Sequence, residues 1–161
     1  MGTLRPAVIS IVLALTFGVA LCMAQSSKVN GRWSVEVAFG NGETRALRFE
    51  ARDSGEGSFL LMDPRSRSWG QAAPSEAKWT QSADGAVMFS GPVEFLIGNI
   101  GRDAGTLVLK GKLGTGAAIT GEAKFFPLPQ DPNDPAAQPS KSGSFNATRL
   151  ADEESSKSSA P

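Results

Sequence analysis

The sequence predicts an all-β protein, an antiparallel up-and-down barrel of eight strands, with a two-sheet β-sandwich as the alternative. Three observations lead to this prediction. Apolar residues recur with a period of two along the middle of the chain, and turn residues separate these segments at short intervals. No stretch after residue 24 has helical spacing.

The first two predicted strands form a hairpin. Residues 40–43, Gly-Asn-Gly-Glu, have the chemistry of a tight turn between them. Apolar side chains at every second position mark both strands: Trp33, Val35, Val37 and Phe39 in the first, and Leu47, Phe49 and Ala51 in the second. This is the pattern of strands with one buried face.

Six further segments have the same pattern: residues 58–62, 77–81, 87–97, 106–113, 117–126 and 144–150. The long strand over 87–97 is expected to bend at Gly91-Pro92, because glycine permits a bulge and proline withholds a ladder donor. Two long connections interrupt the strands. Residues 63–76 are mostly polar, with Arg65, Arg67 and Trp69, and residues 127–141 contain five prolines and are expected to lack helix.

The first 24 residues have the three parts of a secretory signal peptide: Arg5, an apolar run over residues 7–21, and small residues at 22 and 24. The run is shorter than the roughly 20 residues that a spanning helix needs. We therefore expect cleavage after Ala24 and a secreted or periplasmic product. Lipid anchoring at Cys22 is the alternative, which Leu21 before it disfavours.

Three parts follow the leader. Residues 25–30 are expected to be a flexible N-terminal segment, residues 31–150 the barrel domain, and residues 151–161 a disordered polar tail.

The composition excludes several kinds of site. The chain has no His and no Tyr, and its one Cys lies in the leader, so the mature protein has no imidazole or thiol for catalysis or zinc binding. The 16 basic and 16 acidic residues balance, which gives no reason to expect nucleic acid as a partner. We predict a monomeric, non-enzymatic protein without a metal, a cofactor or an integral membrane anchor.

A matched pair of residues lies at the two ends of the predicted barrel. The first and last strands of an up-and-down barrel are neighbours, which places Trp33 beside Arg149, and a tryptophan face holds a guanidinium within about 6 Å. Gly31-Arg32-Trp33 with the closing Arg149 resembles the Gly-x-Trp and arginine of the calycin superfamily, which includes lipocalins, fatty-acid-binding proteins and avidins.

The resemblance implies a barrel that binds small molecules in its interior. It does not extend to the second lipocalin motif or to the tyrosine of biotin sites, because the chain has no Tyr. The polar tail also replaces the helix that follows the last lipocalin strand.

The predicted ligand-binding residues are the large inward-facing side chains: Trp33, Val35, Phe49, Phe89, Phe95, Leu107, Ile119, Phe125 and Phe145. They line either a filled core, since small barrels are often just wide enough for their own side chains, or an apolar pocket. Small residues among them favour space for a ligand: Gly91, Gly111, Gly121 and Ala123.

Other candidate sites have simpler explanations. Four glutamates share the polar faces of their strands and are expected to face solvent: Glu36, Glu50, Glu94 and Glu122. Five clustered arginines form either a patch for anions or, with acidic neighbours, a mixed surface: Arg45, Arg48, Arg52, Arg65 and Arg67.

Residues 131–134, Asp-Pro-Asn-Asp, offer oxygen ligands to calcium but suit a turn equally well. Asn146 begins a glycosylation sequon within a predicted strand.

We expect an exported β-barrel that binds a small apolar or amphipathic ligand in its interior. The alternative is a surface-acting protein-interaction or protease-inhibitor module with a filled core. Small secreted barrels that resemble bacterial metalloprotease inhibitors use a flexible N-terminal segment of the kind expected at residues 25–30. A carboxylate enzyme is the third possibility, and it requires two acidic groups that converge in one cleft.

Overall fold

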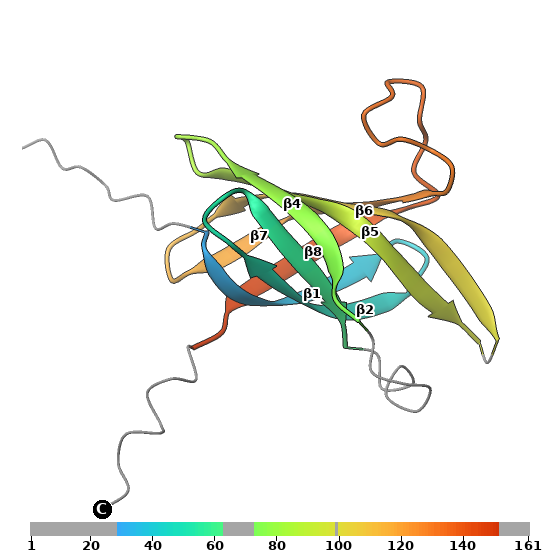
Figure 1. The fold of residues 1–161 in the computed structure, drawn as a ribbon, viewed down its shortest axis with the longest axis horizontal. Coiled ribbons are helices and arrows are strands. Elements are labelled where there is room, and N and C mark those ends of the chain that lie inside the picture. Colours follow the sequence, from blue (N-terminus) through green and yellow to red (C-terminus); the bar gives the residue numbers. More distant parts are fainter. Residues whose placement is uncertain (1–28, 63–72, 99, 152–161) are drawn as a thin grey trace, which may run out of the picture.

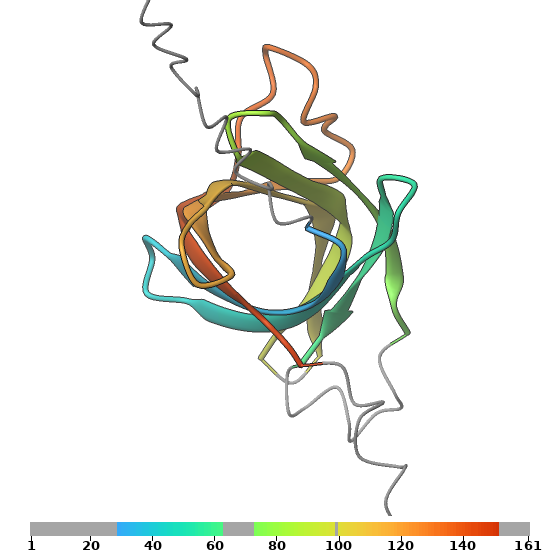
Figure 2. The ribbon, with the colours of Figure 1, turned by 90° about the vertical axis from the view of Figure 1, so that its left-hand side faces the viewer.

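The computed structural model describes residues 29–62, 73–98 and 100–151, and shows a closed barrel of antiparallel strands in sequence order (Figure 1). Its strands are β1 (Gly31–Phe39), β2 (Thr44–Ala51), β3 (Glu56–Leu61), β4 (Ser75–Gln81), β5 (Ala86–Ile97), β6 (Gly101–Leu113), β7 (Ala118–Pro127) and β8 (Lys141–Arg149). Figure 2, a view turned by 90°, shows them as a ring. The predicted eight-stranded up-and-down barrel is confirmed, and the sandwich alternative is excluded.

The ring closes where β1 meets β8. Trp33 of β1 pairs with Phe49 of β2 on one side and with Arg149 of β8 on the other. We call the end of the barrel where β1 begins and β8 ends the Trp33 end. The opposite end, where β8 begins, is the Lys141 end.

The turn between β1 and β2 has the predicted chemistry. Gly42 has a φ of 84°, which favours glycine, and the side-chain oxygen of Asn41 accepts the backbone N–H of Glu43 at 3.0 Å. The backbone N–H of Phe39 donates to the carbonyl of Glu43 at 2.8 Å. The turn therefore fixes Glu43 at the Lys141 end.

The bend predicted at Gly91-Pro92 does not come from a bulge. The register between β5 and β6 runs without interruption from Ala86 to Ile97. A Cβ atom on Gly91 would lie 2.7 Å from the Cβ of Ala77. The glycine therefore allows β4 to approach β5 closely. Close approach of a neighbouring backbone is, besides a bulge, a common reason for glycine inside a strand.

The hairpin of β5 and β6 extends beyond its neighbours at the Lys141 end (Figure 1). The ladder with β4 reaches only to Ser90, and the ladder with β7 begins at Gly105. Strand β6 begins at Gly101, five residues before the predicted start. Near this hairpin, the backbone N–H of Leu128 donates to the carbonyl of Ala104 at 3.1 Å.

The proline-rich connection between β7 and β8 contains two consecutive turns, each begun by an aspartate. The Asp131 carboxylate accepts the backbone N–H of Asn133 at 2.9 Å, and the Asp134 carboxylate accepts that of Ala136 at 2.8 Å. Both carboxylates thus act in turns, as one of the two interpretations of residues 131–134 expects.

Candidate functional site

The predicted ligand-binding residues all face the barrel interior, and each is 4% exposed or less. The ring centroids of Phe49 and Phe89 are 4.2 Å apart, and those of Phe95 and Phe125 are 5.2 Å apart. Side chains that water cannot reach, in direct contact with one another, form a packed core.

Interior glycines make room for aromatic rings. A Cβ on Gly111 would lie 2.8 Å from the ring carbon Cζ of Phe145, and a Cβ on Gly57 would lie 2.8 Å from Cζ of Phe49. The volume that these glycines release is therefore filled by rings of the protein itself, which is a known way to pack glycines in sheets.

The residues just before β1, Val29 and Asn30, close the Trp33 end of the barrel. The guanidinium carbon of Arg149 lies 4.7 Å from the centroid of the Trp33 ring, so the predicted cation–π contact is present. The Arg149 guanidinium also donates to the carbonyl of Asn30 at 2.5 Å. The indole N–H of Trp33 donates to the carbonyl of Val29 at 2.7 Å, and Val29 is fully buried.

Two residues of the segment predicted to be flexible therefore belong to the packed end of the barrel. These are Val29 and Asn30, while residues 25–28 lie outside the described residues.

The Lys141 end carries a network of four charged side chains: Glu43, Arg45, Asp103 and Lys141. The ammonium nitrogen of Lys141 lies 2.8 Å from the carboxylate of Glu43 and 2.9 Å from that of Asp103. Arg45 forms a second ion pair with Glu43. The four side chains are only 13% to 21% exposed, so the pairs are poorly screened by water.

Aromatic rings form the floor beneath this network. The ammonium of Lys141 lies 5.6 to 5.9 Å from the centroids of three rings, those of Phe39, Phe95 and Phe125. Arg45 lies over the Phe95 ring at 5.2 Å and donates to the backbone carbonyl of Leu96 at 3.2 Å. Arg45 of β2 thereby reaches β5 across the end of the barrel.

The network shifts the pKa values of its members. Burial raises the pKa of Glu43, but the hydrogen bonds from Lys141 and Asn41 and the charges of Arg45 and Lys141 outweigh it, so the net pKa is lowered. Burial lowers the pKa of Lys141, but its hydrogen bonds and charge interactions with Glu43 and Asp103 raise the net pKa. Both groups are therefore held in their charged forms at neutral pH.

The apolar pattern of the sequence does not predict this network, but the parity of the strands contains a signal for it. Counting back by twos from Leu47 reaches Arg45 and Glu43, and counting back from Phe145 reaches Lys141. Asp103 shares the parity of Leu107 in the same way. When the inward-facing positions near the end of a strand carry charged residues instead of apolar ones, the sequence indicates a polar end of the barrel.

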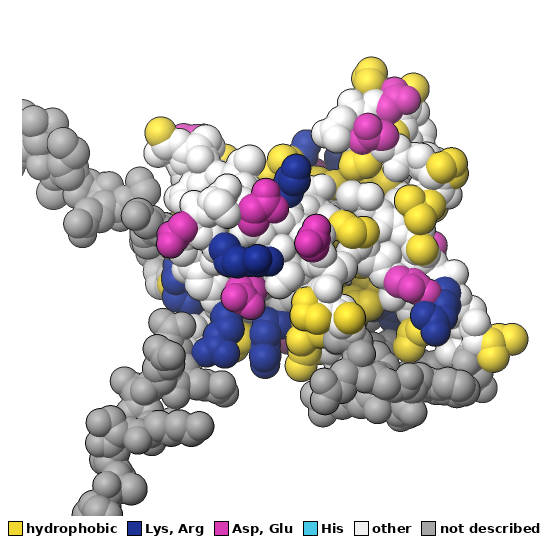
Figure 3. All heavy atoms as spheres, viewed as in Figure 1, with side chains coloured by type: hydrophobic (Ala, Val, Ile, Leu, Met, Phe, Trp, Pro, Cys, Tyr) yellow, Lys and Arg dark blue, Asp and Glu magenta, His cyan; other side chains and the backbone are white. Residues whose placement is uncertain are grey.

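The outer face of the barrel carries the other candidates. Glu36, Glu50, Glu94 and Glu122 are exposed, as expected. In Figure 3 the basic and acidic side chains of the face in view are interspersed. The five clustered arginines do not form one patch, because Arg45 points inward while Arg48 is exposed on the outer face. Arg65 and Arg67 lie outside the described residues.

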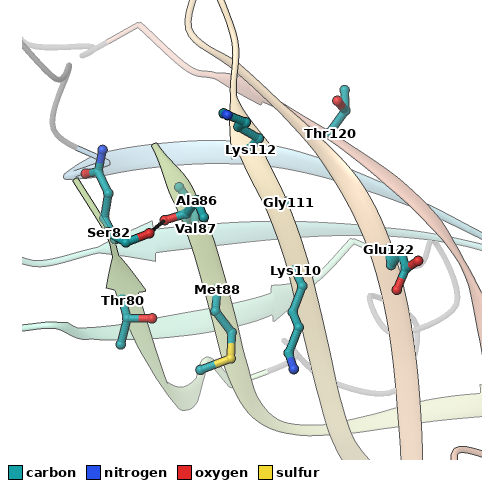
Figure 4. Close-up of a pocket in the computed structure, with 11 residues that line it drawn as sticks. Thr80, Ser82, Ala86, Val87, Met88, Lys110, Gly111, Lys112, Thr120 and Glu122 are labelled. Carbon is teal, nitrogen blue, oxygen red and sulfur yellow. Dashed lines mark hydrogen bonds between the residues drawn. The ribbon is translucent and has the colours of Figure 1, made fainter. Parts of the chain in front are cut away.

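A groove of about 590 Å³ crosses the outer face from β4 to β7 (Figure 4). Thr80, Met88, Lys110 and Glu122 lie along it as successive cross-strand partners. Lys110 and Glu122 are opposite charges on adjacent strands, and Lys112 adds a second positive charge to the lining of the groove.

Three further observations concern metal binding, membrane spans and the glycosylation sequon in the part of the chain that the structure describes. No three Asp, Glu, His or Cys side chains come together there to hold a metal. No helix long and apolar enough to cross a membrane occurs among residues 29–62, 73–98 and 100–151. Asn146 of the sequon is exposed on the outer face of β8.

Comparison of the sequence with protein-family models and with curated proteins found no match.

Proposed function

We propose that this protein is an exported, non-enzymatic barrel that acts through its outer surface as a protein-interaction or protease-inhibitor module. The observation that carries the proposal is the filled interior: every predicted ligand-binding side chain is buried against its neighbours. An interior ligand would have to displace packed aromatic rings. Such a displacement is unfavourable, because it disrupts the contacts of a well-packed core.

The Lys141 end is the part of the surface that best suits a partner. Among the described residues, the large apolar side chains that are exposed are Ile97, Ile100 and Leu128, and all three lie at this end. Ile100, at the tip of the β5–β6 hairpin, is 95% exposed. Because exposed apolar side chains are costly in water unless something covers them, we take this end as the interaction site.

The charges at this end support a non-enzymatic role. Glu43 and Asp103 do converge, which is what a carboxylate enzyme requires, but Lys141 lies between them, and Lys141 and Arg45 together balance their charges. A catalytic lysine needs a lowered pKa and a general acid needs a raised one. The pKa shifts of Lys141 and Glu43 run in the opposite directions.

A calycin-like origin and export are part of the proposal. Gly31, Trp33 and Arg149 form one contact group at the closure of the barrel, in keeping with the calycin resemblance. Export is supported by the leader pattern in residues 1–24, which lie outside the described residues.

Two measurements test the proposal. Native mass spectrometry of the protein from the exporting host is expected to give the bare polypeptide mass, and an apolar molecule released on denaturation would instead favour an interior carrier. A photo-crosslinking residue at Ile100 is expected to capture a protein partner in that host. The same residue at Thr80, exposed on the outer wall, is the matched control. Equal capture at both positions, or none at Ile100, would contradict a role for the Lys141 end.

A further inference from the structure

The Lys141 ammonium occupies a cage that has the chemistry of a ligand site. Its hydrogen-bond acceptors are the carboxylates of Glu43 and Asp103, at 2.8 and 2.9 Å. Its floor consists of the rings of Phe39, Phe95 and Phe125, within 5.9 Å of the nitrogen. Aromatic rings combined with carboxylates are the groups that recognise ammonium ligands in proteins.

The cage is assembled from parts that are distant in sequence. Glu43 ends the β1–β2 turn, Asp103 lies on β6, and the three rings belong to β1, β5 and β7. These parts are held in place by the barrel, since all three rings are 4% exposed or less. The rings therefore do not depend on Lys141 for their position. Arg45 lies over the Phe95 ring from one side, and the Lys141 ammonium lies between the two carboxylates.

The backbone at Lys141 is anchored independently of its side chain. The preceding residue, Ser140, donates its backbone N–H to the carbonyl of Phe125 at 2.9 Å, and Lys141 pairs with Phe125 in the β7–β8 ladder. Loss of the side chain would leave the Asp103 carboxylate without Lys141 and the Glu43 carboxylate paired with Arg45 alone, above apolar rings. With Arg45 still paired to Glu43, one negative charge of the pair of carboxylates stays uncompensated, which favours a cation in the vacated place.

We propose that the Lys141 end contains a binding site for a primary alkylammonium group, which Lys141 fills in the resting protein as a tethered ligand. A free amine takes the same place when the lysine side chain is absent. Because a tethered group has a high effective concentration, the wild-type protein responds little to added amine. This inference is independent of the proposed function.

The test is chemical rescue of Lys141→Ala in the full chain. Thermal unfolding is measured with n-butylammonium chloride, with n-butanol, and with sodium chloride at matched ionic strength. Butylammonium is expected to raise the unfolding midpoint of the variant by several degrees in a saturable manner, and butanol is not. If Lys141→Ala is unfolded alone, butylammonium is expected to refold it where butanol fails.

Two further variants make the result specific. Lys124→Ala removes an exposed lysine that lies 3.7 Å from Glu122, and its midpoint is expected to respond to amine no more than that of the wild type. Adding Asp103→Asn to Lys141→Ala removes one acceptor and is expected to weaken the response severalfold. Equal effects of butanol and butylammonium, equal responses of the two lysine variants, or no response to amine would each overturn the proposal.

Discussion

Arg149 lies over the Trp33 ring because Gly31 leaves room for it. A Cβ on Gly31 would lie 2.9 Å from a terminal nitrogen of the Arg149 guanidinium, and Gly31 has a φ of 118°, which L-residues rarely adopt. The Gly-x-Trp triplet and the closing arginine are thus parts of one contact, made by two strands that are cross-strand partners at Trp33 and Arg149.

This relationship predicts energetic coupling between Gly31 and Arg149. Gly31→Ala is expected to lower the free energy of unfolding by about 1 to 3 kcal/mol through backbone strain and the clash. In an Arg149→Ala background the clash is absent, so the same change should cost less, with a coupling of about 1 kcal/mol. A double-mutant cycle by urea unfolding measures it. Strict additivity of the two changes would contradict the contact.

A second prediction concerns the interior glycines. Gly57→Ala would place a Cβ 2.5 Å from the carbonyl of Glu50 and 2.8 Å from the Phe49 ring, so we expect a loss of about 2 kcal/mol of unfolding free energy. Gly114→Ala is the control, because the nearest atom to its Cβ, the Ala118 carbonyl, is 3.6 Å away. Denaturant melts should show that change within about 0.5 kcal/mol of wild type. Similar losses at both positions would mean that the interior is not filled as described.

Adjacent residues on β5 test the strand parity. Phe95→Asp places an unpaired charge among rings and is expected to cost more than about 3 kcal/mol, enough to unfold the domain. Glu94→Gln removes an exposed ion pair, 2.8 Å from Arg102, and is expected to cost less than about 1 kcal/mol. Circular dichroism and thermal melts compare them. Equal tolerance of both changes would show that the parity is wrong.

The charged network predicts an acid limit to stability. The pKa of Glu43 in the folded protein lies below its usual 4.5, so the unfolded chain takes up a proton at higher pH than the folded one. Stability from this group is therefore present above about pH 4.5 and is lost as the pH falls through the folded pKa. The raised pKa of Lys141 acts at the other limit, where its contribution is lost as the pH rises above 10.5 and through the folded value.

Glu43→Gln separates this contribution from general acid unfolding. The variant is expected to be less stable than wild type at pH 7. The difference should shrink as the pH falls below 4.5, where Glu43 becomes protonated first in the unfolded chain and then, at lower pH, in the folded protein. Urea melts between pH 3 and pH 7 measure the difference. A gap that stays constant or widens towards low pH would rule out a lowered pKa at Glu43.

The sequence predicts the walls of the barrel well and its ends poorly. Along β1, alternate residues from Trp33 to Phe39 are buried, because each strand in the wall has one face on the core. At the ends this rule weakens. Asp103 and Lys141 face inward as charges, and the first residues of β6 belong to a hairpin that extends past its neighbours, so neither shows apolar alternation.

The candidate sites follow the same division. The nine predicted ligand-binding residues are all buried, as their strand parity predicts, because parity is set by local pattern. Whether these residues enclose a cavity depends on how their rings are oriented. The Phe145 ring fills the space beside Gly111 of another strand, and a contact between two strands is not visible in the local pattern. The burial of Val29 has no signal in the sequence, because a single apolar residue before the first strand forms no pattern. In the fold, the indole N–H of Trp33 donates to the Val29 carbonyl.

The pairing of β1 with β8 brings the two ends of the described barrel together: the backbone N–H of Leu150 donates to the carbonyl of Arg32 at 2.8 Å. Circular permutation should therefore be tolerated. A short linker from residue 151 to residue 29, with new termini in the β6–β7 turn, would give a chain that begins with β7 and keeps every other connection. In such a ring the order of the strands matters, but the strand that comes first does not.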